Sequence, residues 1–139
     1  MVGQKRNFAC SRARGEVIAH WDDDDWSEPG RLADQIERLD GHQVSGYSAM
    51  RFTDGSEWFD YFGPISYALG TSLCYRRSWW EAHPFEPLNV GEDNHFVNAA
   101  HSAGALVSVP ARGLMYATTH AGNTSPRIYG SNWKRIENL

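Results

Sequence analysis

Apolar positions recur with helical spacing in several stretches of the chain. Residues 4–14 lack the alternation of a strand and stop at Gly15. Residues 92–103 carry apolar side chains on one side, two acids in the first turn and Gly104 at the end. Both patterns are typical of helices that pack one face on a core.

Another helix is predicted after Ser27, which is a candidate N-cap. Leu32, Ile36 and Leu39 follow at i, i+4 and i+7, and Gly41 is a typical stop. We therefore expect these three apolar side chains to form the buried face of that helix.

Alternating or short apolar runs predict strands in much of the remaining chain. The predicted strands are residues 16–21, 44–52, 58–62, a β-like stretch 66–76, and 106–109 and 114–118, with a short helical turn at 78–83. The dipeptide Asp54-Gly55 predicts a hairpin between two of these strands. The tail is ambiguous, and its apolar residues Trp133, Ile136 and Leu139 suggest a terminal helix. The predicted fold class is α/β, with a mixed sheet and flanking helices.

Composition limits the organisation and the partners. The chain has 139 residues without repeats or a linker-like tract, so a single continuous domain over 1–139 is expected. The 13 basic against 17 acidic residues give a formal net charge of −4, which argues against nucleic acid as a partner.

The sequence also bears on location and redox chemistry. It contains no run long enough to span a membrane and no secretory signal, so we expect no membrane span and a cytoplasmic location. Cys10 and Cys74 stand far apart and match neither zinc nor disulfide spacing. Both are expected to be reduced core residues.

Four consecutive aspartates follow the predicted strand 16–21. Asp22, Asp23, Asp24 and Asp25 repel one another unless a cation lies among them. Carboxylate oxygens are hard ligands that suit Mg²⁺ or Mn²⁺, especially where a diphosphate completes the coordination. A solvated acidic loop is the alternative interpretation.

Further candidates are less specific. Glu92 and Asp93 open a predicted helix, where simple complementation of the helix dipole is an equally good explanation. His120 lies in a polar loop after a strand, where an exposed histidine is common. Trp58 and Trp80 are candidates for stacking on sugar rings, with packing inside the protein as the alternative. The sequence lacks the GxSxG, Walker A and GxGxxG motifs.

Taken in order, these stretches resemble glycosyltransferase family 2, whose members have the glycosyltransferase A-type fold and transfer a sugar from a nucleotide-sugar donor. The matching stretches are residues 3–7 with 13–19, residues 22–25 with Pro29, residues 70–77, residues 91–93, and His120 with Asn123 and Ser125. They resemble the Arg-Asn helix and Gly-Glu strand, the DXD metal motif, the glycine loop, the acceptor-side acidic motif and the C-terminal histidine region of the family.

The resemblance implies a metal-dependent inverting transfer. Asp22, Asp24 and Asp25, with His120, would bind Mn²⁺ or Mg²⁺, and Asp93 would accept the proton of the acceptor hydroxyl. The resemblance also assigns donor binding to Arg6, Asn7, Asp23 and Gly70, and acceptor binding to Glu92, Trp58 and Trp80. The implied partners are a nucleotide-sugar donor and a glycan or another hydroxyl acceptor.

The resemblance covers residue 3 to about residue 125. In the family, two βα units with most of the nucleoside pocket precede the Arg-Asn helix, and units of roughly 30 residues each do not fit before residue 3. We therefore expect a partial, truncated domain. An inactive remnant that binds a metal, a sugar or a protein is the alternative, and a metal-dependent phosphohydrolase is a weaker one. An exposed sheet edge would favour homo-oligomers or pairing with a separate N-terminal half.

Overall fold

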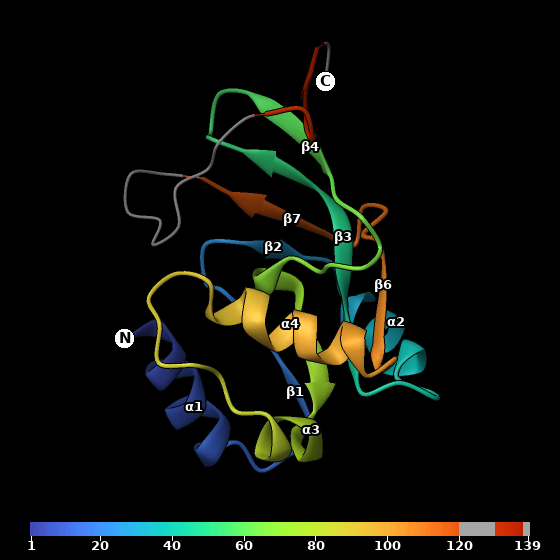
Figure 1. Cartoon of the computed structure of the whole chain (residues 1–139). Coiled ribbons are helices and arrows are strands. Elements are labelled where there is room, and N and C mark those ends of the chain that lie inside the picture. Colours follow the sequence, from blue (N-terminus) through green and yellow to red (C-terminus); the bar gives the residue numbers. More distant parts are fainter. Residues whose placement is uncertain (120–129, 138–139) are drawn as a thin grey trace.

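The computed structural model describes residues 1–119 and 130–137, which form a curved mixed sheet with helices around one part of it (Figure 1). The helices of this part of the chain are α1 (Val2–Arg12), α2 (Arg31–Arg38), α3 (Arg77–Ala82) and α4 (Glu92–Ser102), with the 3-10 turn η1 (Gly70–Ser72). The strands are β1 (Val17–Ala19), β2 (Trp26–Ser27), β3 (Val44–Thr53), β4 (Trp58–Phe62), β5 (Cys74–Arg76), β6 (Leu106–Pro110), β7 (Met115–Thr118) and β8 (Trp133–Ile136). The predicted α/β class is confirmed.

Strand β3 is the centre of the sheet. It pairs antiparallel with β4 and β5 and parallel with β6 and β7. Strand β1 pairs with β5, β8 pairs with β4, and the two-residue β2 pairs with β7. In Figure 1, α1, α3 and α4 gather around the lower part of the sheet, where β1 and β5 lie. This arrangement brings the ends of β1 and β7 to the same region as η1 and α4.

The predicted hairpin between β3 and β4 is confirmed, and its turn uses the expected residues. One carboxylate oxygen of Asp54 accepts hydrogen bonds from the Ser56 and Glu57 amides at 2.9 and 2.8 Å. Gly55 has a φ of 97°, a left-handed conformation that favours glycine. The turn type therefore follows directly from local sequence.

The tail prediction was wrong. Residues 133–136 form β8, which pairs antiparallel with β4, and not a helix. The Trp133 ring packs on Phe52 and Tyr61, with ring centroids 4.8 and 5.0 Å apart. Tertiary pairing and aromatic packing therefore override the apolar spacing of the tail. Leu139 lies outside the described residues.

The register of α2 also differs from the prediction. The helix begins at Arg31 after Gly30, while Ser27 lies in β2. Leu39 is buried, but Leu32 and Ile36 are 39% and 50% exposed. The buried positions of the helix itself are Arg31 and Gln35, whose side chains bond to the protein interior.

The stretch 66–76 is only partly a strand. Residues 70–72 form η1, and the strand β5 begins at Cys74. Leu69 donates its amide to Tyr47 of β3, and Ser72 accepts the Tyr47 amide through its hydroxyl. The turn is thus bonded to the central strand instead of continuing as a strand.

Cys10 and Cys74 are buried free thiols, as expected. Burial raises the pKa of the Cys74 thiol to about 11, so it stays protonated at neutral pH. Among the described residues, no helix has both the length and the apolar character needed to cross a membrane.

Candidate active site

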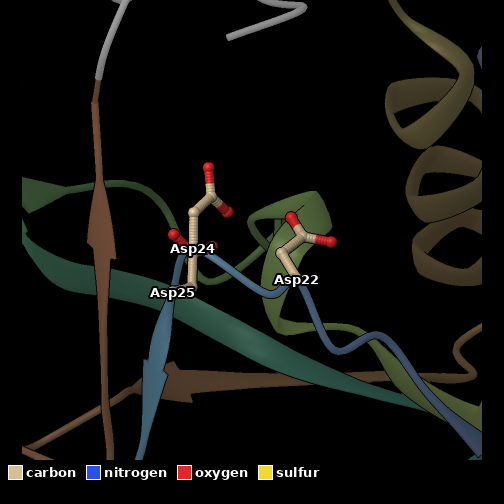
Figure 2. A group of neighbouring side chains, drawn as sticks. All are labelled: Asp22, Asp24 and Asp25. Atoms are coloured by element: carbon tan, nitrogen blue, oxygen red, sulfur yellow. The ribbon is translucent and has the colours of Figure 1, made fainter. Parts of the chain in front are cut away.

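The aspartates lie in the loop that joins β1 to β2. Asp22, Asp24 and Asp25 bring one carboxylate oxygen each to within 4.8 Å of the others, and Figure 2 shows their side chains together on this loop. Asp22 and Asp24 are exposed, and Asp25 is half-buried. Asp23 is exposed and does not belong to this group. The structure therefore gathers three of the four aspartates, which we call the acidic cluster.

Asp25 holds the loop in place. One of its carboxylate oxygens accepts the Thr118 amide of β7 at 2.9 Å, and the other accepts the Thr71 hydroxyl of η1. The Thr118 hydroxyl donates to the Asp24 carbonyl at 2.5 Å. The loop is thus bonded to a strand and to a turn that lie far away in the sequence.

Burial raises the pKa of the Asp25 carboxyl group above its ordinary value. The hydrogen bonds from Thr71 and Thr118 oppose this effect, while the negative charges of Asp22 and Asp24 add to it. A cation beside these carboxylates would offset both the repulsion between them and the cost of burying the charged Asp25 carboxylate.

The donor set of the acidic cluster fits a hard divalent cation. All of its ligand atoms are carboxylate oxygens, which Mg²⁺ and Mn²⁺ prefer. The side chains of Asp22 and Asp24 are exposed to solvent, while the two carboxylate oxygens of Asp25 accept hydrogen bonds from the protein. The predicted ligand His120 lies outside the described residues.

Asp93 lies directly over Gly70. It stands in the first turn of α4, which follows Gly91 in a left-handed conformation. A Cβ atom at position 70 would lie 2.3 Å from an Asp93 carboxylate oxygen and 3.0 Å from the Asp93 Cβ. Glycine at position 70 is therefore required for this placement of Asp93.

Gly70→Ala is expected to displace the predicted base Asp93 and so to lower turnover of the predicted nucleotide-sugar substrate by about 100-fold, because displacing a reacting group by about 1 Å has a cost of that size. The measurement compares turnover with that of Gly63→Ala, in any form of the protein that is active. A Cβ at Gly63 would also clash, at 2.8 Å from the Ser48 carbonyl oxygen, so it controls for overpacking. Equal turnover in the two variants would show that the contact between Gly70 and Asp93 has no role in the reaction.

A largely buried polar network around His20 is bonded to the Gly70 turn. His20, at the end of β1, places Nδ1 2.7 Å from the Gly70 carbonyl oxygen and Nε2 3.0 Å from the Tyr75 hydroxyl. We assign the proton to Nδ1, because so short a contact with a carbonyl oxygen requires a donor. Arg6 contacts His20 Nδ1 at 3.1 Å and donates to buried Glu92 at 3.2 Å. The predicted residues Arg6 and Glu92 are thus paired with each other, and Glu92 directly precedes Asp93 in α4.

His20 makes stability depend on pH. Burial lowers its pKa from 6.5 to about 3, and the Arg6 charge adds to this effect. Between these pH values the unfolded chain binds the extra proton, so stability is full above pH 6.5 and is lost as pH falls towards 3. The loss from this residue is about 1.4 kcal/mol per pH unit. We expect the free energy of unfolding, measured with urea between pH 7 and pH 4, to fall less with decreasing pH in His20→Gln than in the wild type. An equal fall in both proteins would contradict the lowered pKa of His20.

Asn7 and Trp80 make structural contacts. The Asn7 side-chain oxygen accepts the Trp80 indole N–H and the Phe85 amide, both at 2.9 Å. Its amide nitrogen donates to the Phe85 carbonyl at 2.8 Å. These bonds attach α1 to α3 and to the segment that follows α3. That Asn7 binds the nucleotide-sugar donor and Trp80 binds the sugar acceptor stays a prediction.

Trp58 lies elsewhere, on a groove of about 740 Å³ bordered by β3, β4, β7 and the turn after β6. Its ring packs edge to face on Tyr116, with centroids 5.1 Å apart, and Tyr116 stacks on Trp26. Trp26 directly follows Asp25 in the sequence. Trp58 and Trp80 therefore lie in different parts of the molecule.

A smaller cleft of about 320 Å³ lies between α1 and β1. Arg6, Trp21 and Asp22 line it together with His20. It thus joins a predicted donor-binding residue to a predicted metal ligand. No sequence motif indicated Thr71, Thr118, His20 or Arg31 as parts of the site, since single hydroxyls and buried polar residues belong to no motif.

Comparisons with known proteins bear on the family and the fold. The family model for Glycosyl transferase family 2 matches residues 2–111. A solved structure of S. aureus TarS residues 1–349 in complex with UDP-GlcNAc has a TM-score of 0.66 and 23% identity, over 91% of this chain and 42% of that chain. The same TarS fragment in complex with UDP has a TM-score of 0.63 and 24% identity, over 84% and 40%. The chain thus spans about two fifths of these structures. No curated protein sequence matches significantly.

Proposed function

The chain belongs to glycosyltransferase family 2, and from this membership we propose that it takes part in transfer of a sugar from a nucleoside-diphosphate donor to an acceptor hydroxyl, with inversion at the anomeric carbon. One observation carries this proposal. Gly70 and Thr71 are consecutive residues of η1, and the first lies under Asp93 while the second donates to Asp25. A single turn therefore holds the candidate base and the acidic cluster in a fixed relation.

The residues divide into two functions. Asp22 and Asp24, positioned by Asp25, would hold Mg²⁺ or Mn²⁺, which would neutralise charge on the diphosphate leaving group. Asp93 would accept the proton of the acceptor hydroxyl as this oxygen attacks from the face opposite the diphosphate. The bond to the diphosphate breaks as the new glycosidic bond forms, so no covalent nucleophile is needed. Arg6 would contact the donor from the cleft that it shares with Asp22.

The proposed donor is a UDP-sugar, because the similar TarS structures hold UDP-GlcNAc and UDP. Isothermal titration of UDP, UDP-GlcNAc and other UDP- and GDP-sugars, with Mn²⁺ and with EDTA, tests the proposal. We expect binding that requires the metal. A folded chain that binds none of these nucleotides would instead support the second candidate, an inactive module that binds a metal, a sugar or a partner.

Strand β1 lies at one end of the principal strand order, and its pairing partner among the described residues is β5. Its other edge suits an added strand, so we propose that β1 pairs with the same strand of a second copy. Light scattering would contradict self-pairing if the chain stays monomeric at high concentration. A cytoplasmic location stays a prediction.

A further inference from the structure

Arg31 is a fully buried charge whose hydrogen bonds all go to uncharged groups. Its Nε donates to the Gln35 side-chain oxygen at 2.9 Å, and one terminal nitrogen donates to the Ser27 hydroxyl at 3.0 Å. The other contacts the carbonyl oxygens of His20 at 2.9 Å and Thr71 at 3.4 Å. Among the described residues, none offers Arg31 a carboxylate at salt-bridge distance.

Burial of an unpaired guanidinium is costly, so this arrangement needs a physical reason. Burial lowers the pKa of Arg31, while Tyr47 and Cys74, followed by Asp22 and Asp25, act in the opposite direction. The acidic cluster is thus one of several groups that influence the guanidinium. The guanidinium lies 5.0 Å from the centroid of the Trp21 ring, directly before the cluster in sequence.

The two carbonyls that Arg31 joins belong to the two ends of the site. His20 stands two residues before Asp22, at the end of β1, and Thr71 donates its hydroxyl to Asp25. Gln35 reinforces the same link, because its amide nitrogen donates to the Ser72 carbonyl at 2.6 Å. Helix α2 is therefore bonded to two segments. One is the end of β1, which leads into the acidic loop, and the other is η1, which is bonded to Asp25 of that loop.

We propose that Arg31, supported by Gln35, is a positioning residue that ties the end of β1 to η1 and so sets the placement of the Asp22 and Asp24 carboxylates that a divalent cation requires. This inference rests on the proposed metal site. Groups that orient the ligands of a metal commonly change its affinity by about 10- to 100-fold when removed.

Charge and position have opposite effects here, which makes the inference testable. Loss of a positive charge beside a cation site strengthens cation binding by Coulomb's law, whereas loss of positioning weakens it. The probe is Mn²⁺ alone, titrated into the whole chain. We expect Arg31→Met to bind Mn²⁺ at least about tenfold more weakly, and Arg31→Lys, which keeps the charge but not the fork of donors, to bind it more weakly as well.

Arg76→Met is the matched control. Arg76 donates to the carbonyls of His42 at 3.2 Å and Leu39 at 2.8 Å, at the other end of α2. Like Arg31, Arg76 bonds to backbone carbonyls of two residues, but those carbonyls do not belong to the acidic loop. Loss of its side chain should therefore lower the melting temperature and leave Mn²⁺ affinity unchanged. Unchanged or tighter Mn²⁺ binding by Arg31→Met would overturn the inference.

A second readout does not depend on the metal. The Thr118 amide donates to Asp25, so its hydrogen exchange reports the position of that carboxylate. We expect faster exchange in Arg31→Lys and in Gln35→Met than in Arg76→Met. Arg31→Lys and Gln35→Met are milder substitutions, and they test the inference where Arg31→Met does not fold. Should the wild-type chain bind no Mn²⁺, the metal part of the proposed function fails, and equal Thr118 exchange in the three variants would then overturn the role of Arg31.

Discussion

Asp93→Asn is expected to lower turnover of the nucleotide-sugar donor by about 100- to 10,000-fold, the usual contribution of a general base. Asparagine has nearly the same shape, so it fits over Gly70, where a Cβ would lie 2.3 Å from the carboxylate. It cannot accept the proton of the acceptor hydroxyl. The measurement is release of nucleoside diphosphate, in any form of the protein that is active.

The same variant should bind Mn²⁺ and UDP like the wild type, because Asp93 does not belong to the acidic cluster. Asp40→Asn is a suitable control, since it removes one carboxylate charge at an exposed site. Full turnover by Asp93→Asn would remove this residue from the role of base. Loss of nucleotide binding would instead assign Asp93 to the donor site.

Asp24→Ala is expected to weaken Mn²⁺ binding at least about tenfold and to abolish metal-dependent binding of the donor, because it deletes an accessible carboxylate ligand. The fold should persist, because the Thr118 hydroxyl bonds to the Asp24 backbone carbonyl, which the substitution keeps. Thermal unfolding of the variant beside the wild type checks that it is folded.

Calorimetry with Mn²⁺ alone, and then with UDP, checks this prediction against Asp40→Ala. Asp25→Ala should differ, because it loses the bonds to Thr118 and Thr71 and with them part of the loop's attachment. If Asp24→Ala kept its Mn²⁺ and nucleotide affinity, that result would falsify the metal assignment.

The sequence predicted those parts of the fold whose signals are local. The β3–β4 hairpin follows from an Asp-Gly turn with its own side-chain bonds, and α4 follows from two acids before an apolar face. The position of the acidic cluster followed from four aspartates directly after a strand. These features depend on residues that are neighbours along the chain.

The remaining features depend on partners that are distant along the chain. The spacing of Leu32, Ile36 and Leu39 predicted a buried stripe, yet Arg31 and Gln35 occupy the interior, because the carbonyls of His20, Thr71 and Ser72 are there to receive them. The family resemblance predicted Asp93 as base, but its contact with Gly70 could be seen only in three dimensions. Apolar spacing is visible in a sequence, whereas backbone carbonyls that accept hydrogen bonds from distant side chains are not.

The pairing of β3 has a consequence for the order of folding. Its hairpin with β4 closes locally, whereas its partners β5, β6 and β7 arrive from progressively later parts of the chain. Long-range pairings of this kind form slowly, because their loops must close before the contacts stabilise them. The bond between Thr118 and Asp25 joins one of the last strands to one of the first loops. We therefore expect the geometry of the candidate site to form late in folding, and protection of the Thr118 amide during refolding would mark its completion.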